Sequence, residues 1–245
     1  QNDRRLTPDE IAILTAWADT GAKEGSPKQA PAPRTYTTGW TIGKPDIVYE
    51  MPKPFAVPAS GTVEYHYMII PTGFTEDKWV ELAEIRPGNR AVNHHILAFV
   101  RPKGSKWFAD QPAGEAFLPK ARSEGGPSEL LVGYAPGVPA QKLPPGQARL
   151  VPAGADLVLQ LHYTANGTAT TDQSKIGIIF SKQPPTERVL TLQATNNRFE
   201  IPPMADNHLV TSSFTLNAET KLVSLTPHMH VRGKAFEYRA VYPTG

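Results

Sequence analysis

Nineteen glycines and twenty-five prolines interrupt this 245-residue chain at irregular intervals, with no collagen-like period. Both residue types end regular elements and favour turns, so the chain can hold only short segments of regular structure. Hydrophobic residues make up 40% of the sequence and charged residues 20%, which favours a globular core over disorder. The pattern therefore predicts an all-β fold of short strands, as one large β domain or two smaller ones.

The strand pattern begins after a linker rich in Gly, Ser and Pro. Alternating or short apolar runs predict strands at 62–70, 78–86, 92–100, 156–164, 174–181, 187–194, 208–216, 220–227 and 235–242. The stretch 101–150 is rich in Gly and Pro and is expected to form loops, with a short strand near 130–132. A Pro-Pro pair at 184–185 suggests a domain boundary there.

Residues 6–20 carry the signals of a helix. Thr7 is a candidate N-cap, Pro8 suits the first helical position, and Glu10 completes a capping box. A helical apolar stripe that includes Trp17 follows, and Gly21 is a good terminator. This segment resembles the last helix of a c-type cytochrome domain, which implies a haem protein as a source of electrons. The alternative is a helix that docks against the sheet.

Composition excludes several classes of protein. The chain has no cysteine, which rules out disulfides, thiolate nucleophiles and iron–sulfur clusters. A net charge of +2 without a dense basic run makes nucleic acid an unexpected partner. No apolar stretch approaches the roughly 20 residues needed to span a bilayer. There is also no phosphate-binding glycine loop and no paired-carboxylate motif.

Four of the seven histidines lie in two short motifs, His94-His95 and His228-Met229-His230. Clustered imidazoles are good ligands for copper or zinc. Because strand side chains alternate between faces, His228 and His230 would share one face, whereas His94 and His95 would diverge. The adjacent pair can hold one metal ion only through a β-bulge or a strong local twist. The alternative is histidines on a solvated sheet face.

A fifth histidine, His162, lies near the end of the apolar run 157–163. Leu157, Leu159, Leu161 and Tyr163 would form one face, and His162 would lie on the opposite, more polar face beside Gln160. His162 could therefore face a cleft, with a surface position as the alternative.

Taken in order, the stretches VNHHIL (92–97), LQLHY (159–163) and LTPHMHVRG (225–233) resemble the copper type II, ascorbate-dependent monooxygenase family. The resemblance runs from about residue 44 to the end of the chain. It implies two antiparallel, jelly-roll-like β-sandwich domains, each with a copper ion, preceded here by the short helix. The implied organisation is a cytochrome-like helix at 1–25, a linker at 26–43, an N-terminal copper domain at 44–183 and the start of a C-terminal copper domain at 186–245, truncated.

The resemblance also implies the roles of individual residues. His94, His95 and His162 match the ligands of the electron-transfer copper, and His228 and His230 match histidines of the catalytic copper that binds O2. The implied activity is hydroxylation of a C–H bond in a small-molecule or peptide substrate, with ascorbate or a haem protein as reductant. The absence of cysteine favours a bacterial member, and copper chemistry favours a periplasmic or extracellular location.

One ligand of the family pattern is missing. The family completes its catalytic copper with a methionine well downstream of the HxH motif, whereas the four methionines here are Met51, Met68, Met204 and Met229. We therefore expect this chain alone to be inactive if it is a fragment. The alternative function is a copper-binding or electron-transfer module without oxygenase activity, and a weaker one is an interaction domain that binds zinc adventitiously.

Overall fold

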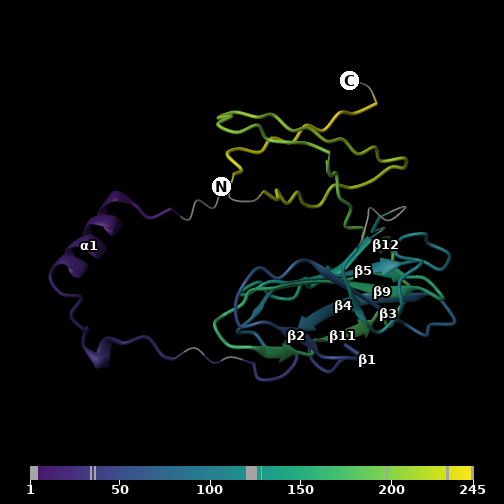
Figure 1. The fold of residues 1–245 in the computed structure, drawn as a ribbon, viewed down its shortest axis with the longest axis horizontal. Coiled ribbons are helices and arrows are strands. Elements are labelled where there is room, and N and C mark those ends of the chain that lie inside the picture. Colours follow the sequence, from purple (N-terminus) through teal and green to yellow (C-terminus); the bar gives the residue numbers. More distant parts are fainter. Residues whose placement is uncertain are drawn as a thin grey trace.

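The computed structural model describes residues 5–33, 35, 37–119, 126–127, 129–196, 198–229 and 232–243 (Figure 1). Its regular strands lie between residues 47 and 188 and form two five-stranded sheets and one two-stranded sheet. All pairings between strands are antiparallel except one short parallel pair at a sheet edge. The expected all-β sandwich is thus confirmed.

Each five-stranded sheet joins strands that are distant in sequence. In spatial order, the first sheet consists of β1 (Ile47–Glu50), β11 (Lys175–Phe180), β4 (Lys78–Arg86), β8 (Gln147–Val151) and β12 (Glu187–Arg188). The second consists of β6 (Ala116–Phe117), β3 (His66–Pro71), β9 (Asp156–Tyr163), β5 (Asn93–Arg101) and β7 (Glu129–Tyr134). The two-stranded sheet pairs β2 (Phe55–Val57) with β10 (Thr170–Asp172).

The main core lies between the two five-stranded sheets. Strand β9 contributes the predicted apolar face, and Leu157, Leu159, Leu161 and Tyr163 are all buried. They pack in one cluster with side chains of the opposite sheet, such as Ile178 of β11. Each fully buried aliphatic side chain of this kind contributes about 1.5–3 kcal/mol, so this face fixes the register of β9.

The other face of β9 points away from the sandwich interior. Val158 on this face joins a second cluster with Ile69, Phe99, Trp107 and Phe108, which covers one end of the sheet. Gln160 and His162 lie further along the same face and are only partly buried. The alternation read from the sequence is confirmed, and it leaves a polar strip on the outer face of the second sheet.

Helix α1 (Pro8–Asp19) has the predicted start and end. Thr7 and Glu10 form a reciprocal capping box, and Gly21 beyond the C-cap has a φ of 90°. Every residue of the helix is exposed, including Trp17, and Figure 1 shows α1 set apart from the sheets. The alternative in which this helix docks against the sheet is therefore wrong.

The C-terminal segment 189–243 differs most from expectation. Its described residues contain no strand, so the strands expected at 208–216, 220–227 and 235–242 are wrong, and only the start of 187–194 pairs, as β12. Figure 1 shows the segment running back and forth beside the sandwich. Its apolar residues, such as Leu209 and Val241, remain exposed. An amphipathic strand forms only against a surface that buries its apolar side and a neighbour that pairs its backbone.

Several strands were not expected in full from the sequence, namely β1, β2, β6, β8, β10 and half of β7. Most of them lie at sheet edges or in the small sheet, where pairing with distant segments decides the structure more than local pattern does. Within the described part of the chain, no helix is long and apolar enough to cross a lipid bilayer.

Candidate metal centre

A β-bulge brings the adjacent histidines to one side of the second sheet. Asn93 pairs with Tyr163, and His95 pairs with His162, so two steps along β5 match one step along β9. His94 is the additional residue in this register shift. Because a bulge breaks the alternation of side chains, Asn93 is buried in the core while His95 lies on the outer face. This is the irregularity that the sequence required for joint binding.

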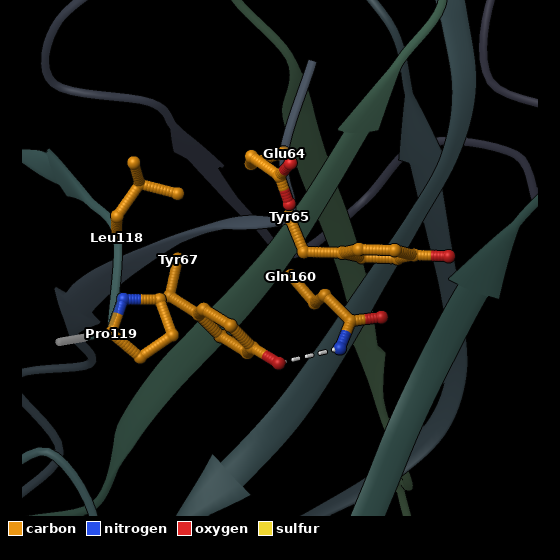
Figure 2. Close-up of a pocket in the computed structure, with 6 residues that line it drawn as sticks. All are labelled: Glu64, Tyr65, Tyr67, Leu118, Pro119 and Gln160. Atoms are coloured by element: carbon orange, nitrogen blue, oxygen red, sulfur yellow. Dashed lines mark hydrogen bonds between the residues drawn. The ribbon is translucent and has the colours of Figure 1, made fainter. Parts of the chain in front are cut away.

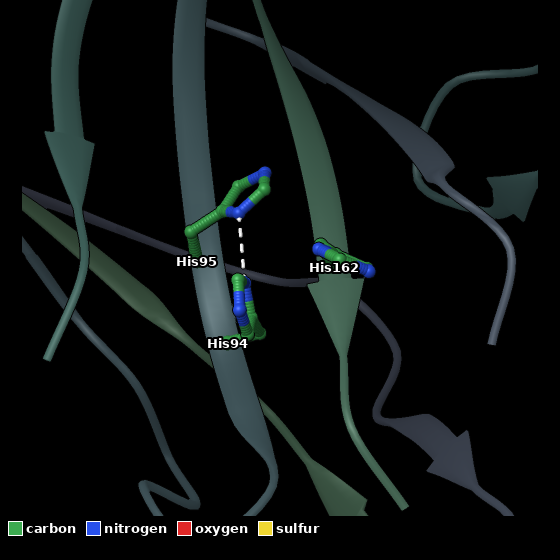
Figure 3. Close-up of side chains that lie close together, drawn as sticks. All are labelled: His94, His95 and His162. Atoms are coloured by element: carbon green, nitrogen blue, oxygen red, sulfur yellow. Dashed lines mark hydrogen bonds between the residues drawn. The ribbon is translucent and has the colours of Figure 1, made fainter. Parts of the chain in front are cut away.

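The three imidazoles from β5 and β9 converge. One ligand nitrogen from each of His94, His95 and His162 lies within 4.8 Å of the other two. The Nδ1 atoms of His94 and His95 are 3.1 Å apart, and Figure 3 shows this contact and the ring of His162 beside it. The ring centroid of His162 lies 4.7 Å from that of His94 and 4.8 Å from that of His95. Three imidazole nitrogen atoms at this spacing suit copper or zinc.

The surroundings of His95 keep its imidazole ring unprotonated, which is the form that can bind a metal ion. Burial lowers the pKa of His95 to about 4, and the neighbouring His162, His94 and His228 add to this effect, opposed by a hydrogen bond with Gln160. The ring is therefore neutral at physiological pH. Since only the neutral form has a nitrogen lone pair to donate, a metal ion meets little competition from protons at His95.

Two further side chains, Tyr65 and Gln160, support the histidines. The ring of Tyr65 stacks on His162, with centroids 4.2 Å apart and an interplanar angle of 22°. Gln160 Nε2 donates a 2.8 Å hydrogen bond to the Tyr67 hydroxyl, which turns the amide oxygen of Gln160 toward other donors. The hydrogen bond between Gln160 and His95 fits this orientation, since ligating imidazoles usually donate their second N–H to an oxygen.

The sequence placed Gln160 on the same polar face as His162, but it did not point to Tyr65 or Tyr67. Both tyrosines lie at the start of β3, Tyr65 just before it and Tyr67 within it, and β3 pairs with β9. The alternation of Tyr65 and Tyr67 in the predicted strand was the available signal. These tyrosines reach the site only because β3 pairs with β9, the strand that carries His162. That pairing joins segments that are far apart in the sequence, so the local pattern does not predict it.

Of the four other histidines, the structure describes three, and none of these three belongs to the cluster. His228 is exposed in a stretch without regular structure, and it is near enough for its charge to lower the pKa of His95. His230, the other predicted catalytic ligand, lies outside the described residues. His66 contacts the Glu64 carbonyl at 2.8 Å and packs on Phe55. The exposed His208 belongs to no cluster of metal-ligand side chains among the described residues.

The fold and this site together define an all-β sandwich with a three-histidine candidate metal centre on the outer face of one sheet. No protein-family model and no curated protein matches this chain. The chemistry of the site must therefore be argued from its own residues.

Proposed function

We propose that this chain is the copper-binding part of a monooxygenase that hydroxylates a C–H bond with O2 and an external reductant. The observation that carries the proposal is the convergence of His94, His95 and His162 across the bulge. Copper at these residues would supply one-electron redox chemistry. The protein's part is to fix the ligands and keep His95 neutral, with Tyr65 and Gln160 holding the rings.

Copper is favoured over zinc by the donor set. Copper binds more tightly than zinc to a given set of nitrogen ligands. A structural zinc site usually has four protein ligands, and these are often cysteines. This chain has no cysteine. Catalytic zinc is also bound by three histidines, but no carboxylate belongs to the described cluster to act as a general base. The residues of the site therefore fit copper better than either a structural or a catalytic zinc ion.

The second copper would be held by His228 and His230. The contribution of His228 to the lowered pKa of His95 supports a second site near the first. The substrate, a small molecule or peptide, and O2 would meet there. The proposed location is the periplasm or the outside of the cell, with ascorbate or a cytochrome c as reductant.

The metal content of the copper-loaded chain tests this function. After Cu(II) loading and dialysis, we expect copper to remain bound with the electron paramagnetic resonance (EPR) spectrum of nitrogen ligands. His95→Ala and His162→Ala should each lose one copper, whereas His208→Ala, the exposed histidine outside the cluster, should lose none. Equal copper content in all three variants would contradict the site.

The second candidate function is a copper-binding or electron-transfer module, and the cluster itself favours it because its described ligands are all imidazoles. A thioether ligand favours Cu(I), so a site without one is biased toward Cu(II). Consumption of O2 by the reduced, copper-loaded chain separates the two. Oxygen uptake that disappears in His228→Ala and His230→Ala supports the oxygenase, whereas the module predicts that both variants keep the full copper content of the chain and show no oxygen uptake.

A further inference from the structure

A pocket of about 480 Å³ opens beside the three histidines on the outer face of the second sheet. It is lined by Glu64, Tyr65, Tyr67, Leu118, Pro119 and Gln160 (Figure 2). This volume lies within the range of small-molecule sites. Two of its lining residues are those that support the histidines, since Tyr65 stacks on His162 and Gln160 hydrogen-bonds His95. A molecule in the pocket would therefore be one side chain away from the candidate metal centre.

The chemistry of the lining selects the kind of molecule. Two tyrosine rings, Leu118 and Pro119 offer contact to a planar apolar ring. The Tyr67 hydroxyl accepts its hydrogen bond from Gln160 and so keeps its own proton for a ligand oxygen. Burial raises the pKa of Tyr67, which keeps this hydroxyl a donor. These features fit a planar molecule with hydroxyl groups.

The negative charge of the pocket lining further limits the kind of ligand that fits it. Glu64 is the only charged residue among those that line it in the described part of the chain. An exposed carboxylate in the lining repels an anion and can accept a hydrogen bond from a neutral hydroxyl. An anionic enediol such as ascorbate is therefore disfavoured relative to a neutral dihydroxybenzene.

We propose that this pocket binds a neutral dihydroxybenzene, of which hydroquinone is the simplest example, as the electron donor for the copper site. The proposal rests on the proposed function and names its reductant in place of ascorbate or a cytochrome c. With copper bound at the histidines, the donor would lose one electron to the cupric ion and one proton to the Glu64 carboxylate, and it would leave as a neutral oxygen-centred radical. The Tyr65–His162 stack and the Gln160–His95 hydrogen bond are the contacts that join the pocket to the ligands.

The experiment uses the full chain loaded with Cu(II), with hydroquinone and ascorbate as probes. Loss of the Cu(II) EPR signal after rapid mixing gives the reduction rate at each donor concentration. We expect the rate to saturate with hydroquinone and to rise linearly with ascorbate. Leu118→Trp, which fills the pocket, should raise the half-saturating hydroquinone concentration at least tenfold. Val138→Trp, at an exposed apolar position that does not line the pocket, should leave it within twofold.

Charge reversal provides an independent arm. Glu64→Lys should accelerate reduction by ascorbate several-fold at low ionic strength, with the gain reduced by salt, and should not accelerate reduction by hydroquinone. Rates that do not saturate with hydroquinone, or that are equal in Leu118→Trp and Val138→Trp, would overturn the proposal while copper binding still supports the proposed function. A chain that binds no copper would overturn both.

Discussion

The hydroxyl of Tyr163 donates a 2.9 Å hydrogen bond to Oδ2 of Asp172, whose side chain is buried in the core. The same oxygen accepts a hydrogen bond from Ser174 Oγ at 2.6 Å, and Oδ1 accepts one from the backbone N–H of Asn89, also at 2.6 Å. Tyr163 directly follows His162, and Asn89 lies in the turn that leads into β5. One carboxylate therefore holds together the ends of both strands that carry the three histidines.

Replacing this carboxylate should destabilise the sandwich at the site. In Asp172→Asn one oxygen becomes an NH2 group that faces a hydrogen-bond donor, so at least one buried bond is lost. Because hydrogen bonds to charged groups are worth about 1.5–3 kcal/mol each, we expect the free energy of unfolding to fall by about 2–3 kcal/mol in urea denaturation. Tyr163→Phe removes only one bond and should cost less. An Asp172→Asn protein as stable as the original would contradict this account.

The turn before β5 is packed too closely to accept a side chain at Gly88. A Cβ atom there would lie 2.7 Å from the backbone oxygen of Gln173, next to Asp172. The contacting atoms of Gln173 belong to the backbone and cannot rotate away. The clash could therefore be relieved only if the turn at Gly88 moved away from Gln173. We expect Gly88→Ala to lower the free energy of unfolding by about 1–3 kcal/mol, as overpacking does. Gly39→Ala, with open space around its Cβ, is the matched control and should change it by less than about 0.5 kcal/mol.

Asn93 carries a buried amide at the bulge. Within the described residues, neither its Nδ2 nor its Oδ1 has a hydrogen-bond partner, and the residue is 3% exposed. Burying an unpaired amide costs about 1–3 kcal/mol. Asn93→Leu, of similar size, should therefore raise the melting temperature of the metal-free protein, and Asn93→Asp should lower it. A lower melting temperature in Asn93→Leu would indicate that the amide has a partner in solution.

The depressed pKa of His95 gives the metal-free protein a defined pH dependence. The folded pKa of about 4 lies below the ordinary value of 6.5, so the unfolded chain takes up this proton first as the pH falls. Stability should be independent of His95 above pH 6.5 and should decrease between pH 6.5 and about 4. His95→Gln should reduce that decrease, and His208→Gln should not. Titration of the His95 ring resonances with a midpoint near 6.5 would refute the shift.

Sequence reasoning found the parts of the fold that repeat a pattern over a long segment. Strand β4 lies at 78–86 as expected, and the two faces of β9 follow the alternation around Leu161 and His162. The capping box of α1 was also found, because it depends on neighbours in sequence. Segments such as 208–216 were also predicted to be strands and yet form none, since an apolar pattern does not supply a partner for the backbone.

The candidate site was predicted only as far as local spacing allows. The pattern showed that His94 and His95 need a bulge to act together, and it placed His162 on a polar face. It gave no means of knowing that β5 and β9 are neighbours, or that Tyr65 lies over His162, because those contacts join segments that are far apart along the chain. The candidate ligands could therefore be read from the sequence, whereas their surroundings depend on the topology of the sheet.

The bulge at His94 has a consequence for transplanting this site into another protein. Three histidines grafted at matching positions of a regular two-strand ribbon would place one ring on the wrong side, however well the residues were copied. The transferable unit is the extra residue together with the unchanged pairing on either side of it, which keeps Asn93 opposite Tyr163 and His95 opposite His162. A designer would therefore have to copy a β-bulge, and the insertion of a single residue between 93 and 95 would separate the three candidate ligands without replacing any of them.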